Sequence, residues 1–420
     1  MAFKLPNWSE LSKVQRETLE LDTGKSWVIP GSPGTGKSVL ALYRAVELIG
    51  KRKKVLFLVY NKNLQRYLES ARKYLDSQPR YKNYAFENLE IRTYHSYFHR
   101  VYGNYRTRVP LIDPNNGYSY DFAQIERDLV DGRVRINKDH IIVDEAQDFP
   151  ESLIKALKAA DKPVTCFIDD NQKITSETTN YHLALSVLGD GSPYFLDTNY
   201  RNTEQIVELS KIFYDDDNLA TSKRSGDIPE FYRMNHEDQI EGILNVIDNH
   251  PGKTVGIFVE RRRMSRLSRN LENSVVDFEY YFTNRRFSID FESDNPKVFT
   301  PQTMKGLEFD IVIIPYFDEW DEFMPRVPEK RLENGRILLQ SVDAAVRTRF
   351  IEKSIYVGIT RAGDNLYCFY ERDSDTVKKI KQVKGASIAT FYDSDEDSPE
   401  TESDTRVSWS DLTSGDDVPY

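Results

Sequence analysis

The chain alternates short apolar runs with longer amphipathic segments. Runs rich in β-branched and aromatic residues predict strands, and the first series lies at 26–31, 54–60, 89–95, 140–146, 164–170 and 193–198. A second series lies at 229–234, 254–260, 278–282, 310–317 and 365–371. Segments with helical spacing of apolar residues separate these runs, for example at 38–50, 150–160 and 238–250. Because strands that alternate with helices form parallel sheets covered on both faces, the pattern predicts two tandem α/β domains with a hinge near 197–204.

The end of the chain has a different pattern, poor in periodic apolar residues and rich in Ser, Asp and Glu. Residues 393–420 contain ten acidic residues and one basic residue, Arg406, so most of the net charge of −10 lies there. Such a segment buries too little apolar surface to offset its ordering entropy, and we expect 385–420 to be a disordered acidic tail. Three roles stay open for it: partner docking, competition for a basic strand channel, or solubility.

The remaining residues are nearly neutral overall, so local basic runs can still meet phosphate groups. These runs are Lys51–Lys54, Arg261–Arg263 and Arg285–Arg286. An ordinary solvated surface is the alternative interpretation of each run.

Apolar stretches are too short to span a bilayer, and the first ten residues lack a signal-peptide profile, so we expect a cytoplasmic protein without a membrane partner. Cys166 and Cys368 both lie inside apolar runs. This placement favours buried free thiols over a disulfide or a thiolate metal site.

The segment between the first predicted strand and the helix after it matches the phosphate-binding loop pattern. Its residues are Gly31, Ser32, Pro33, Gly34, Thr35, Gly36, Lys37 and Ser38. Glycines allow backbone amides to turn toward a phosphate, Lys37 can reach the β and γ oxygens, and Ser38 can ligate magnesium. The pattern therefore predicts that the chain binds ATP with Mg²⁺.

A second acidic element ends the strand predicted at 140–146. Asp144 and Glu145 follow its apolar residues. A carboxylate at the carboxyl end of a parallel strand can hold the metal, and its neighbour can polarise the attacking water. We predict that Asp144 is the metal ligand together with Ser38, and that Glu145 is the general base.

These blocks, in this order, resemble the UvrD/Rep-like group of superfamily 1 helicases over roughly residues 10–370. Besides the phosphate loop and the DEAQD block at 144–148, the similar segments are LSKVQ ending at Gln15, TYHS at 93–96, DDNQ ending at Gln172, NYRN at 199–202, KGLEFD at 305–310 and YVGITRA at 356–362.

The resemblance implies a role for each of these positions. Gln15 would read the adenine, Gln172 would sense the γ-phosphate, Tyr200 would stack on the adenine, and Gly306 and Glu308 would lie at the nucleotide, with Glu308 on the ribose. Arg201 and Arg361 would be the two γ-phosphate fingers. The strand contacts would be Tyr60, Asn61, Thr93, Tyr94, His95 and Ser96.

At the level of the whole chain, the resemblance implies two tandem RecA-like P-loop NTPase domains. The expected boundaries are 1–198 for the first domain, with a reduced insertion at about 97–139, then 199–384 for the second domain with the arginine fingers, and 385–420 for the tail. The implied activity is an ATP hydrolase that translocates 3′ to 5′ along single-stranded DNA, with ATP held in a cleft between the domains.

Two departures from the family pattern leave an alternative open. The accessory insertions are reduced, and Leu58-Val-Tyr60-Asn61 stands where the family often has Thr-Phe-Thr-Asn. Tyr60, Tyr94, Tyr97 and Phe98 could serve as base-stacking platforms, although aromatic residues in such runs also fit a core. The alternative function is a nucleic-acid-sensing ATPase subunit that regulates a partner nuclease in a bacterial defence or repair complex.

Overall fold

The computed structural model contains two compact α/β units. It describes residues 5–117, 119–172, 179–189, 193–213, 220–272, 274–280, 293–304, 306–322, 344–383 and 388–393. The first unit comprises Met1–Arg201, Phe213–Arg224 and Lys305–Leu307, and the second comprises Asn202–Ile212, Ser225–Met304 and Glu308–Tyr420. Each is considered by itself.

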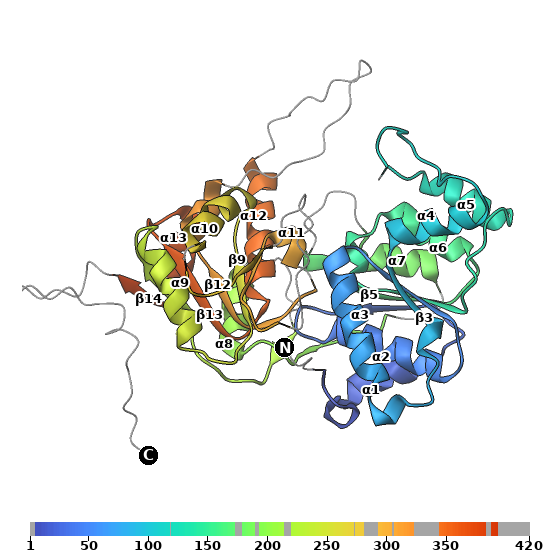
Figure 1. Cartoon of the computed structure of the whole chain (residues 1–420), viewed down its shortest axis with the longest axis horizontal. Coiled ribbons are helices and arrows are strands. Elements are labelled where there is room, and N and C mark those ends of the chain that lie inside the picture. Colours follow the sequence, from blue (N-terminus) through green and yellow to red (C-terminus); the bar gives the residue numbers. More distant parts are fainter. Residues whose placement is uncertain are drawn as a thin grey trace, which may run out of the picture. The chain divides into compact units, whose positions relative to one another are not determined.

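The first unit is built on a five-stranded sheet in the order β1-β5-β4-β2-β3, and every pairing in it is parallel. Figure 1 labels β3 and β5 of this sheet and the helices around it. The strands are β1 (Trp27–Pro30), β2 (Val55–Val59), β3 (Leu89–Thr93), β4 (His140–Val143) and β5 (Val164–Ile168). β2, β4 and β5 are buried along their whole length. Strands covered on both faces need continuous apolar runs, which is the pattern that the sequence has.

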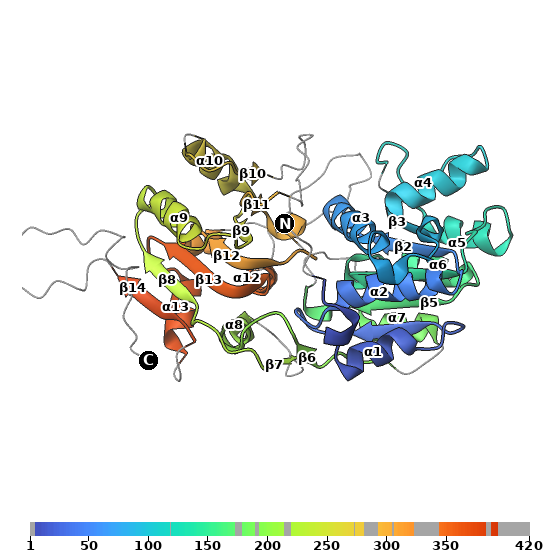
Figure 2. The ribbon, with the colours of Figure 1, turned by 60° about the horizontal axis from the view of Figure 1, so that its bottom comes forward.

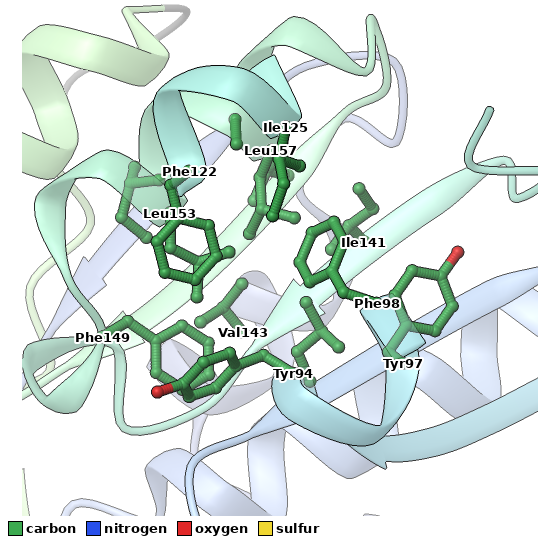
Figure 3. Close-up of a cluster of buried hydrophobic side chains, with 14 of the residues drawn as sticks. Tyr94, Tyr97, Phe98, Phe122, Ile125, Ile141, Val143, Phe149, Leu153 and Leu157 are labelled. Atoms are coloured by element: carbon green, nitrogen blue, oxygen red, sulfur yellow. The ribbon is translucent and has the colours of Figure 1, made fainter. Parts of the chain in front are cut away.

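Helices cover both faces of this sheet. The core on one face contains residues of α1 (Lys13–Glu20), α2 (Lys37–Gly50) and α3 (Lys62–Asp76). The core on the other face contains residues of α4 (Tyr94–Asn104), α5 (Phe122–Val130), α6 (Glu151–Ala159) and α7 (Tyr181–Leu188). Figure 3 shows the aromatic and aliphatic side chains of the second core, which α4, α5 and α6 place over β4.

The second unit has a seven-stranded sheet in the order β10-β11-β9-β12-β13-β8-β14, again with parallel pairings only (Figure 2). Its strands are β8 (Glu230–Arg233), β9 (Val255–Phe258), β10 (Glu279–Tyr280), β11 (Lys297–Phe299), β12 (Phe309–Ile314), β13 (Ala362–Tyr370) and β14 (Thr390–Asp393). The helices are α8 (Glu204–Ser210), α9 (Asp238–Asp248), α10 (Arg261–Leu271), α11 (Pro301–Met304), α12 (Ala344–Ile359) and α13 (Asp375–Gln382).

Short elements complete the two units. β6 (Thr198–Asn199) and β7 (Thr221–Ser222) pair with each other in the first unit. The 3₁₀ helices are η1 (Trp8–Glu10), η2 (Pro79–Tyr81), η3 (Phe86–Asn88), η4 (Ala146–Asp148), η5 (Asp170–Gln172), η6 (Lys211–Phe213) and η7 (Phe317–Glu322).

The predicted fold class, α/β with two tandem units and parallel sheets, is confirmed. The strand predicted at 193–198 is wrong in its extent, because only Thr198 belongs to a strand, the short β6, and the rest of the segment forms an isolated bridge between Leu196 and Gly31. The backbone N–H groups of Tyr194 and Leu196 donate to the carbonyls of Val28 and Pro30, at 3.1 and 2.9 Å. Pro30 lacks the N–H that would donate back between these two bonds, so a regular ladder cannot form along this edge.

The tail boundary also needs correction. Residues 390–393, which we assigned to the disordered tail, form strand β14 beside β8. Phe391 stacks on Phe231 with ring centroids 4.9 Å apart, and Tyr392 stacks on Tyr232 at 4.6 Å. These two aromatic side chains give the segment the apolar contacts that the acidic residues after it lack. Residues 394–420 lie outside the described part of the chain.

The first continuous segment of the first unit runs to Arg201 rather than to residue 198, and the unit also includes Phe213–Arg224 and Lys305–Leu307. Cys166 and Cys368 are buried free thiols, which confirms that prediction. No helix among the described residues is long and apolar enough to cross a membrane.

Candidate nucleotide-binding site

The carboxyl ends of three neighbouring strands in the first unit carry the predicted phosphate-site residues. β5 lies between β1 and β4 in the sheet. The phosphate loop follows β1, Asp169 follows β5, and Asp144 follows β4. Because all three strands are parallel, their carboxyl ends share one edge, where ligands of open α/β sheets bind.

The phosphate loop has the backbone that its glycines permit. Gly34 and Gly36 have φ values of 76° and 85°, in the left-handed region that glycine adopts without strain. A Cβ atom on Gly34 would lie 2.0 Å from the side-chain oxygen of Asn199, so a side chain there has no room. The Thr35 hydroxyl donates to the Ser32 carbonyl at 2.9 Å, and α2 begins directly after Gly36.

Lys37 is held inside this loop. Its ammonium donates to the carbonyl oxygens of Gly31 and Ser32 at 2.8 and 2.9 Å. It also lies 3.2 Å from Oδ2 of Asp169, and both side chains of this ion pair are buried. Burial of both charges makes the pair mutually dependent, because removal of either would leave the other charge uncompensated.

The residues at the predicted metal site fit Mg²⁺. The Ser38 side chain lies beside the Asp144 carboxylate, which is 0 % exposed. Burial and the neighbouring Glu145 raise the pKa of Asp144, while Ser38 and Lys37 oppose this rise. Oδ2 of Asp144 has no hydrogen-bond partner among the described residues. A buried carboxylate with an open oxygen beside a hydroxyl is a suitable oxygen donor set for a hard cation.

Glu145 has an unusual backbone conformation for a residue with a side chain. Its φ of 54° lies in the left-handed region, which costs on the order of 1 kcal/mol for a non-glycine residue. The side chain of Gln147 donates to the Glu145 carboxylate and accepts from the backbone N–H of Asp169 at 2.9 Å. Gln147 thereby connects the predicted base to the residue that pairs with Lys37.

Gln172 joins the same group of side chains. Its amide nitrogen donates to Oδ2 of Asp169 at 2.9 Å, so that this one oxygen accepts from both Gln172 and Lys37. The amide oxygen of Gln172 is buried without a hydrogen-bond partner among the described residues. The predicted γ-phosphate sensor is therefore one hydrogen bond away from the carboxylate that pairs with the lysine of the phosphate loop.

Gln15 lies beside the phosphate loop. Its Nε2 donates to the Thr35 carbonyl at 3.4 Å, and its Oε1 accepts from the Ser12 N–H in a capping box at the start of α1. The buried guanidinium of Arg44 on α2 donates to the carbonyls of Leu19 and Leu21 at 3.1 and 2.9 Å. These hydrogen bonds connect the end of α1 to α2, the helix that directly follows the glycines of the phosphate loop.

The segment after β6 is also attached to the loop. The N–H of Tyr200 donates to the Gly34 carbonyl at 2.8 Å, and the Tyr200 side chain is 41 % exposed. The N–H of Arg201 donates to the Asn199 side chain at 3.0 Å. Tyr200 and Arg201, which we placed in the second domain, therefore group with the first unit. Ser32 accepts a further bond from the N–H of Ala220 at 3.1 Å.

In the second unit, Glu308 and Arg361 precede neighbouring parallel strands. Phe309 of β12 is in register with Ala362 of β13, and the N–H of Phe309 donates to the Arg361 carbonyl at 3.1 Å. The Arg361 side chain is buried, and its Nε donates to the Val357 carbonyl at 3.1 Å. The two predicted nucleotide contacts are thus adjacent along one edge of this sheet.

Asn202 fixes the backbone on both sides of Arg361. Its side-chain nitrogen donates to the carbonyl of Thr360 at 3.1 Å and to that of Ala362 at 2.5 Å. Asn202 is buried and directly follows Arg201 in sequence.

Gly306 is the remaining residue of the predicted nucleotide contacts. It has a φ of 76°, and a Cβ atom there would lie 2.9 Å from the Leu64 side chain. Lys305, which begins the KGLEFD block, lies outside the described residues.

The predicted strand contacts follow β2 and β3 at the same edge as the phosphate loop. Asn61 and Thr93 use their side chains to cap α3 and α4, and Ser96 donates to the Thr93 carbonyl at 3.0 Å. Tyr60 and His95 are half-buried, and burial and His99 lower the pKa of His95 to about 4. His95 is therefore neutral near pH 7 and carries no positive charge for a phosphate.

Tyr94, Tyr97 and Phe98 are core residues. Tyr94 is 6 % exposed, and its ring packs against that of Phe149 at 5.2 Å (Figure 3). Tyr97 and Phe98 are buried in the same cluster. A ring in this position presents no face for a base, so the stacking interpretation of these three residues is corrected to a core role. Tyr60 alone keeps partial exposure.

Sequence reasoning missed the linking residues of the site. Gln147, Asp169, Asn199 and Asn202 lie inside the helicase-like blocks, but the sequence pattern gave them no role. The signal for Gln147 and Asp169 was their polar character in segments that directly follow buried strands, since buried polar groups almost always have partners.

Comparison with known proteins identifies a family. The family model described as Schlafen group 3, DNA/RNA helicase domain, matches residues 25–235, which is half of the chain. No match was found among curated protein sequences.

Solved structures show weaker similarity. The C-terminal domain of a possible DNA helicase from Lactobacillus plantarum WCFS1 has 16 % identity and a TM-score of 0.32, covering 46 % of this chain and 99 % of that one. Arterivirus nonstructural protein 10, a helicase, has 13 % identity and a TM-score of 0.37, covering 88 % and 63 %. Its complex with DNA has 12 % identity and a TM-score of 0.39, covering 88 % and 65 %. This chain thus spans less than two thirds of the arterivirus chains.

Proposed function

This chain belongs to the Schlafen group 3 DNA/RNA helicase domain family, and on that premise we propose that it is an ATP-dependent translocase or helicase of single-stranded DNA. The finer assignment, UvrD/Rep type with 3′ to 5′ movement, is supported by the sequence blocks that resemble that group. The hydrolytic reaction is supported by the phosphate-site residues of the first unit.

One observation carries the proposal. Five polar side chains from three separate blocks form a continuous chain of contacts: Lys37 pairs with Asp169, Asp169 accepts from Gln172, and Gln147 connects Asp169 to Glu145. All five are buried. Burial of polar groups is unfavourable unless they are hydrogen-bonded, and these five are hydrogen-bonded to one another beside the phosphate loop. Buried clusters of ionisable groups are typical of functional sites, which supports a catalytic role for this one.

The first unit supplies the binding groups for ATP. Lys37 exchanges its bonds to the Gly31 and Ser32 carbonyls for the β- and γ-phosphate oxygens, while Gln15 and Tyr200 flank the loop to hold the adenine. Ser38 and Asp144 would hold Mg²⁺, which when bound neutralises charge that develops on the phosphate oxygens.

Glu145 accepts a proton from the attacking water. Its carboxylate is buried at the carboxyl end of β4, and Gln147 fixes its orientation by the hydrogen bond to it. Gln172 contacts the γ-phosphate, and its hydrogen bond to Asp169 couples this contact to the position of Lys37. Arg201 and Arg361 stabilise the negative charge of the transition state, which in phosphoryl transfer is the largest contribution that side chains make.

The two proposed γ-phosphate arginines lie on different units, which would connect ATP hydrolysis to movement of the protein along a strand. Arg201 belongs to the first unit and Arg361 to the second. If both bind the γ-phosphate, ATP draws the units together and hydrolysis releases them, and this cycle advances the protein along a strand. Tyr60, Asn61, Thr93, His95 and Ser96 are the proposed strand contacts of the first unit, at the carboxyl ends of β2 and β3.

An alternative is an ATPase subunit that senses nucleic acid and regulates a partner nuclease. The observation in its favour is the small insertion between β3 and β4. Residues of α4 and α5 there pack into the core of the first unit, so this insertion forms part of the unit rather than a separate duplex-engaging lobe.

Steady-state ATPase assays with and without single-stranded DNA test the proposal. We expect Lys37→Ala and Glu145→Gln each to lower kcat at least a hundredfold, on the scale of losing an essential catalytic group. Glu145→Gln should still bind a fluorescent ATP analogue, because the phosphate loop is unchanged.

The matched control is Glu151→Gln, which removes an exposed carboxylate from the start of α6 and should leave kcat unchanged. Persistent hydrolysis in Glu145→Gln would contradict the assignment of the base, and no stimulation by DNA or RNA would contradict both candidate functions. Displacement of a labelled strand by the protein alone would distinguish the motor from the regulatory subunit.

A further inference from the structure

A second polar pocket lies at the opposite edge of the sheet in the first unit. Its cavity has a volume of about 420 Å³. It is lined by residues that precede β2, β3 and β4 and by one side of α4. In a parallel sheet, the amino ends of strands lie at the edge away from their carboxyl ends, so this pocket is separate from the phosphate loop.

Positive charge dominates the lining of this pocket. Lys54, Arg100, Arg135 and Lys138 contribute four cations, against the single carboxylate of Glu87. The side chains come from four separate segments of the chain. This convergence distinguishes the pocket from a basic run on one solvated helix face, and we name it the Lys54 pocket.

Two carboxylates beside the lining already have partners. Asp139 accepts from the backbone N–H of Lys54 at 2.8 Å. Glu90 accepts from Arg92, Arg100 and Lys138, at 2.5, 2.5 and 2.9 Å. Burial alone would raise the pKa of Glu90, but these hydrogen bonds hold it below its ordinary value. One carboxylate among three cations leaves an excess of positive charge, and neither Lys54 nor Arg135 belongs to this cluster.

The basic run at 51–54 leads into the pocket. Lys51 follows the last turn of α2, where a cation is favourable because of the helix dipole. That explanation accounts for Lys51 but does not extend to Lys54, which lines the cavity three residues later.

The lining favours a backbone ligand over a base. Tyr97 is the one aromatic residue among the lining residues, and at 2 % exposure it offers no stacking surface. Asn88, Asn104 and Asn137 add amide groups that can donate to phosphate oxygens. A polar, cationic cavity without a stacking platform suits phosphodiester groups rather than a nucleotide base.

We propose that the Lys54 pocket binds the backbone phosphates of a nucleic-acid strand, at a second site away from the strand contacts beside the phosphate loop. This proposal depends on the proposed function in one respect, which is that the partner of the protein is a nucleic acid. The pocket would hold a strand independently of sequence and of the ATP cycle, and so lengthen the attachment of the protein.

The test is a double variant, Lys54→Gln with Arg135→Gln, in the full chain. Both side chains are exposed at the pocket and lie outside the Glu90 cluster. Binding of a fluorescent single-stranded oligothymidylate is measured by anisotropy without nucleotide at several salt concentrations, and an RNA of equal length is measured in parallel. We expect about a tenfold rise in Kd at low salt, and a salt-dependence slope smaller by about 0.7 for each phosphate that the variant no longer neutralises.

The control variant, Lys73→Gln with Lys155→Gln, removes two exposed cations outside the pocket lining and should bind like the wild type. Equal affinities and equal slopes for pocket variant and wild type would overturn the proposal. Loss of inorganic pyrophosphate binding with unchanged oligonucleotide binding would overturn it too, by showing a small-anion site. ATPase activity without nucleic acid should stay unchanged in the pocket variant. A failure of the pocket proposal can therefore be distinguished from a failure of the proposed ATPase function.

Discussion

At the residue scale, a single carboxylate oxygen connects the parts of the candidate site. Oδ2 of Asp169 accepts from Lys37 and from Gln172, and the backbone of the same residue donates to Gln147. The lysine, the predicted γ-phosphate sensor Gln172 and the predicted base Glu145 are therefore positioned through one residue. If the Lys37 ammonium moves to a phosphate, the buried Asp169 carboxylate loses its counterion. The hydrogen bond from Gln172 then becomes more important for stabilising the negative charge of Asp169.

Asn202 provides a residue-scale prediction. Asn202→Ala should lower the kcat of ATP hydrolysis about tenfold with little change in KM, because the carbonyls on both sides of Arg361 lose their donor and the finger loses its fixed place. Steady-state kinetics and binding of a fluorescent nucleotide measure the two quantities separately.

The matched control for this variant is Asn365→Ala on β13. It removes one hydrogen bond to Asp227 at 2.8 Å in an exposed position, and kcat should stay at the wild-type value. A rise in KM with unchanged kcat in Asn202→Ala would contradict the positioning role, and an equal loss of kcat in both variants would show a general effect on the unit.

At the element scale, strand order determines which groups meet. β5 separates β1 from β4, and Asp169 therefore lies between the lysine after β1 and the acids after β4. A strand can also be weakened by one residue: Pro30 on the free edge of β1 removes the N–H that a sixth strand would need. The chain at 193–198 accordingly runs beside β1 with two backbone bonds and continues to Tyr200.

The first residue of β4 provides an element-scale prediction about pH. Burial, with the charge of Arg44, lowers the pKa of His140 to about 3, below the ordinary value of 6.5. The unfolded chain then binds a proton at higher pH than the folded chain does, so the stability from a neutral His140 is complete above about pH 6.5 and is lost as the pH falls toward 3. Between pH 7 and pH 5 this residue should account for a loss of about 2 kcal/mol in the free energy of unfolding.

Urea unfolding of wild type and His140→Gln at the two pH values measures this contribution. The variant should lose less stability than the wild type between pH 7 and pH 5. Thr165→Val, which removes the hydroxyl 2.8 Å from Nε2 of His140, keeps the titrating ring and should retain most of the wild-type pH dependence. Parallel pH dependence in wild type and His140→Gln would contradict the assignment.

At the scale of the whole molecule, the chain consists of two parallel-sheet units, and the second sheet continues to Asp393. Arg233 of β8 and Asp393 of β14 form an ion pair at 3.4 Å. The acidic segment therefore begins directly after a strand of the second unit rather than after a linker.

Two truncations test this boundary. A chain that ends at residue 393 should keep wild-type ATPase activity and thermal stability. A chain that ends at residue 387 should lose about 2 kcal/mol of stability, because the rings of Phe391 and Tyr392 no longer stack on those of Phe231 and Tyr232. Thermal unfolding followed by circular dichroism measures both, and identical melting temperatures for the two truncations would contradict a structural role for β14.

The sequence by itself determined the features that depend on neighbours along the chain. The glycines and lysine of residues 31–38, the acids after β4, the continuous apolar strands and the helix starts at Ser12 and Thr93 all depend on local backbone geometry and periodicity. From these, the α/β class, the tandem units and the phosphate loop could be predicted.

Tertiary structure alone decided which polar groups meet and which aromatic rings are buried. Lys37 and Asp169 are 132 positions apart, and no local pattern specifies that this carboxylate, rather than Asp144, pairs with the lysine. Tyr94 occupies a strand-contact position in sequence but packs into the core against Phe149, and Phe391 lies beside an acidic run but pairs with Phe231. Periodicity describes what a segment can bury, whereas its partners are decided by the strand order and by the packing of the whole unit.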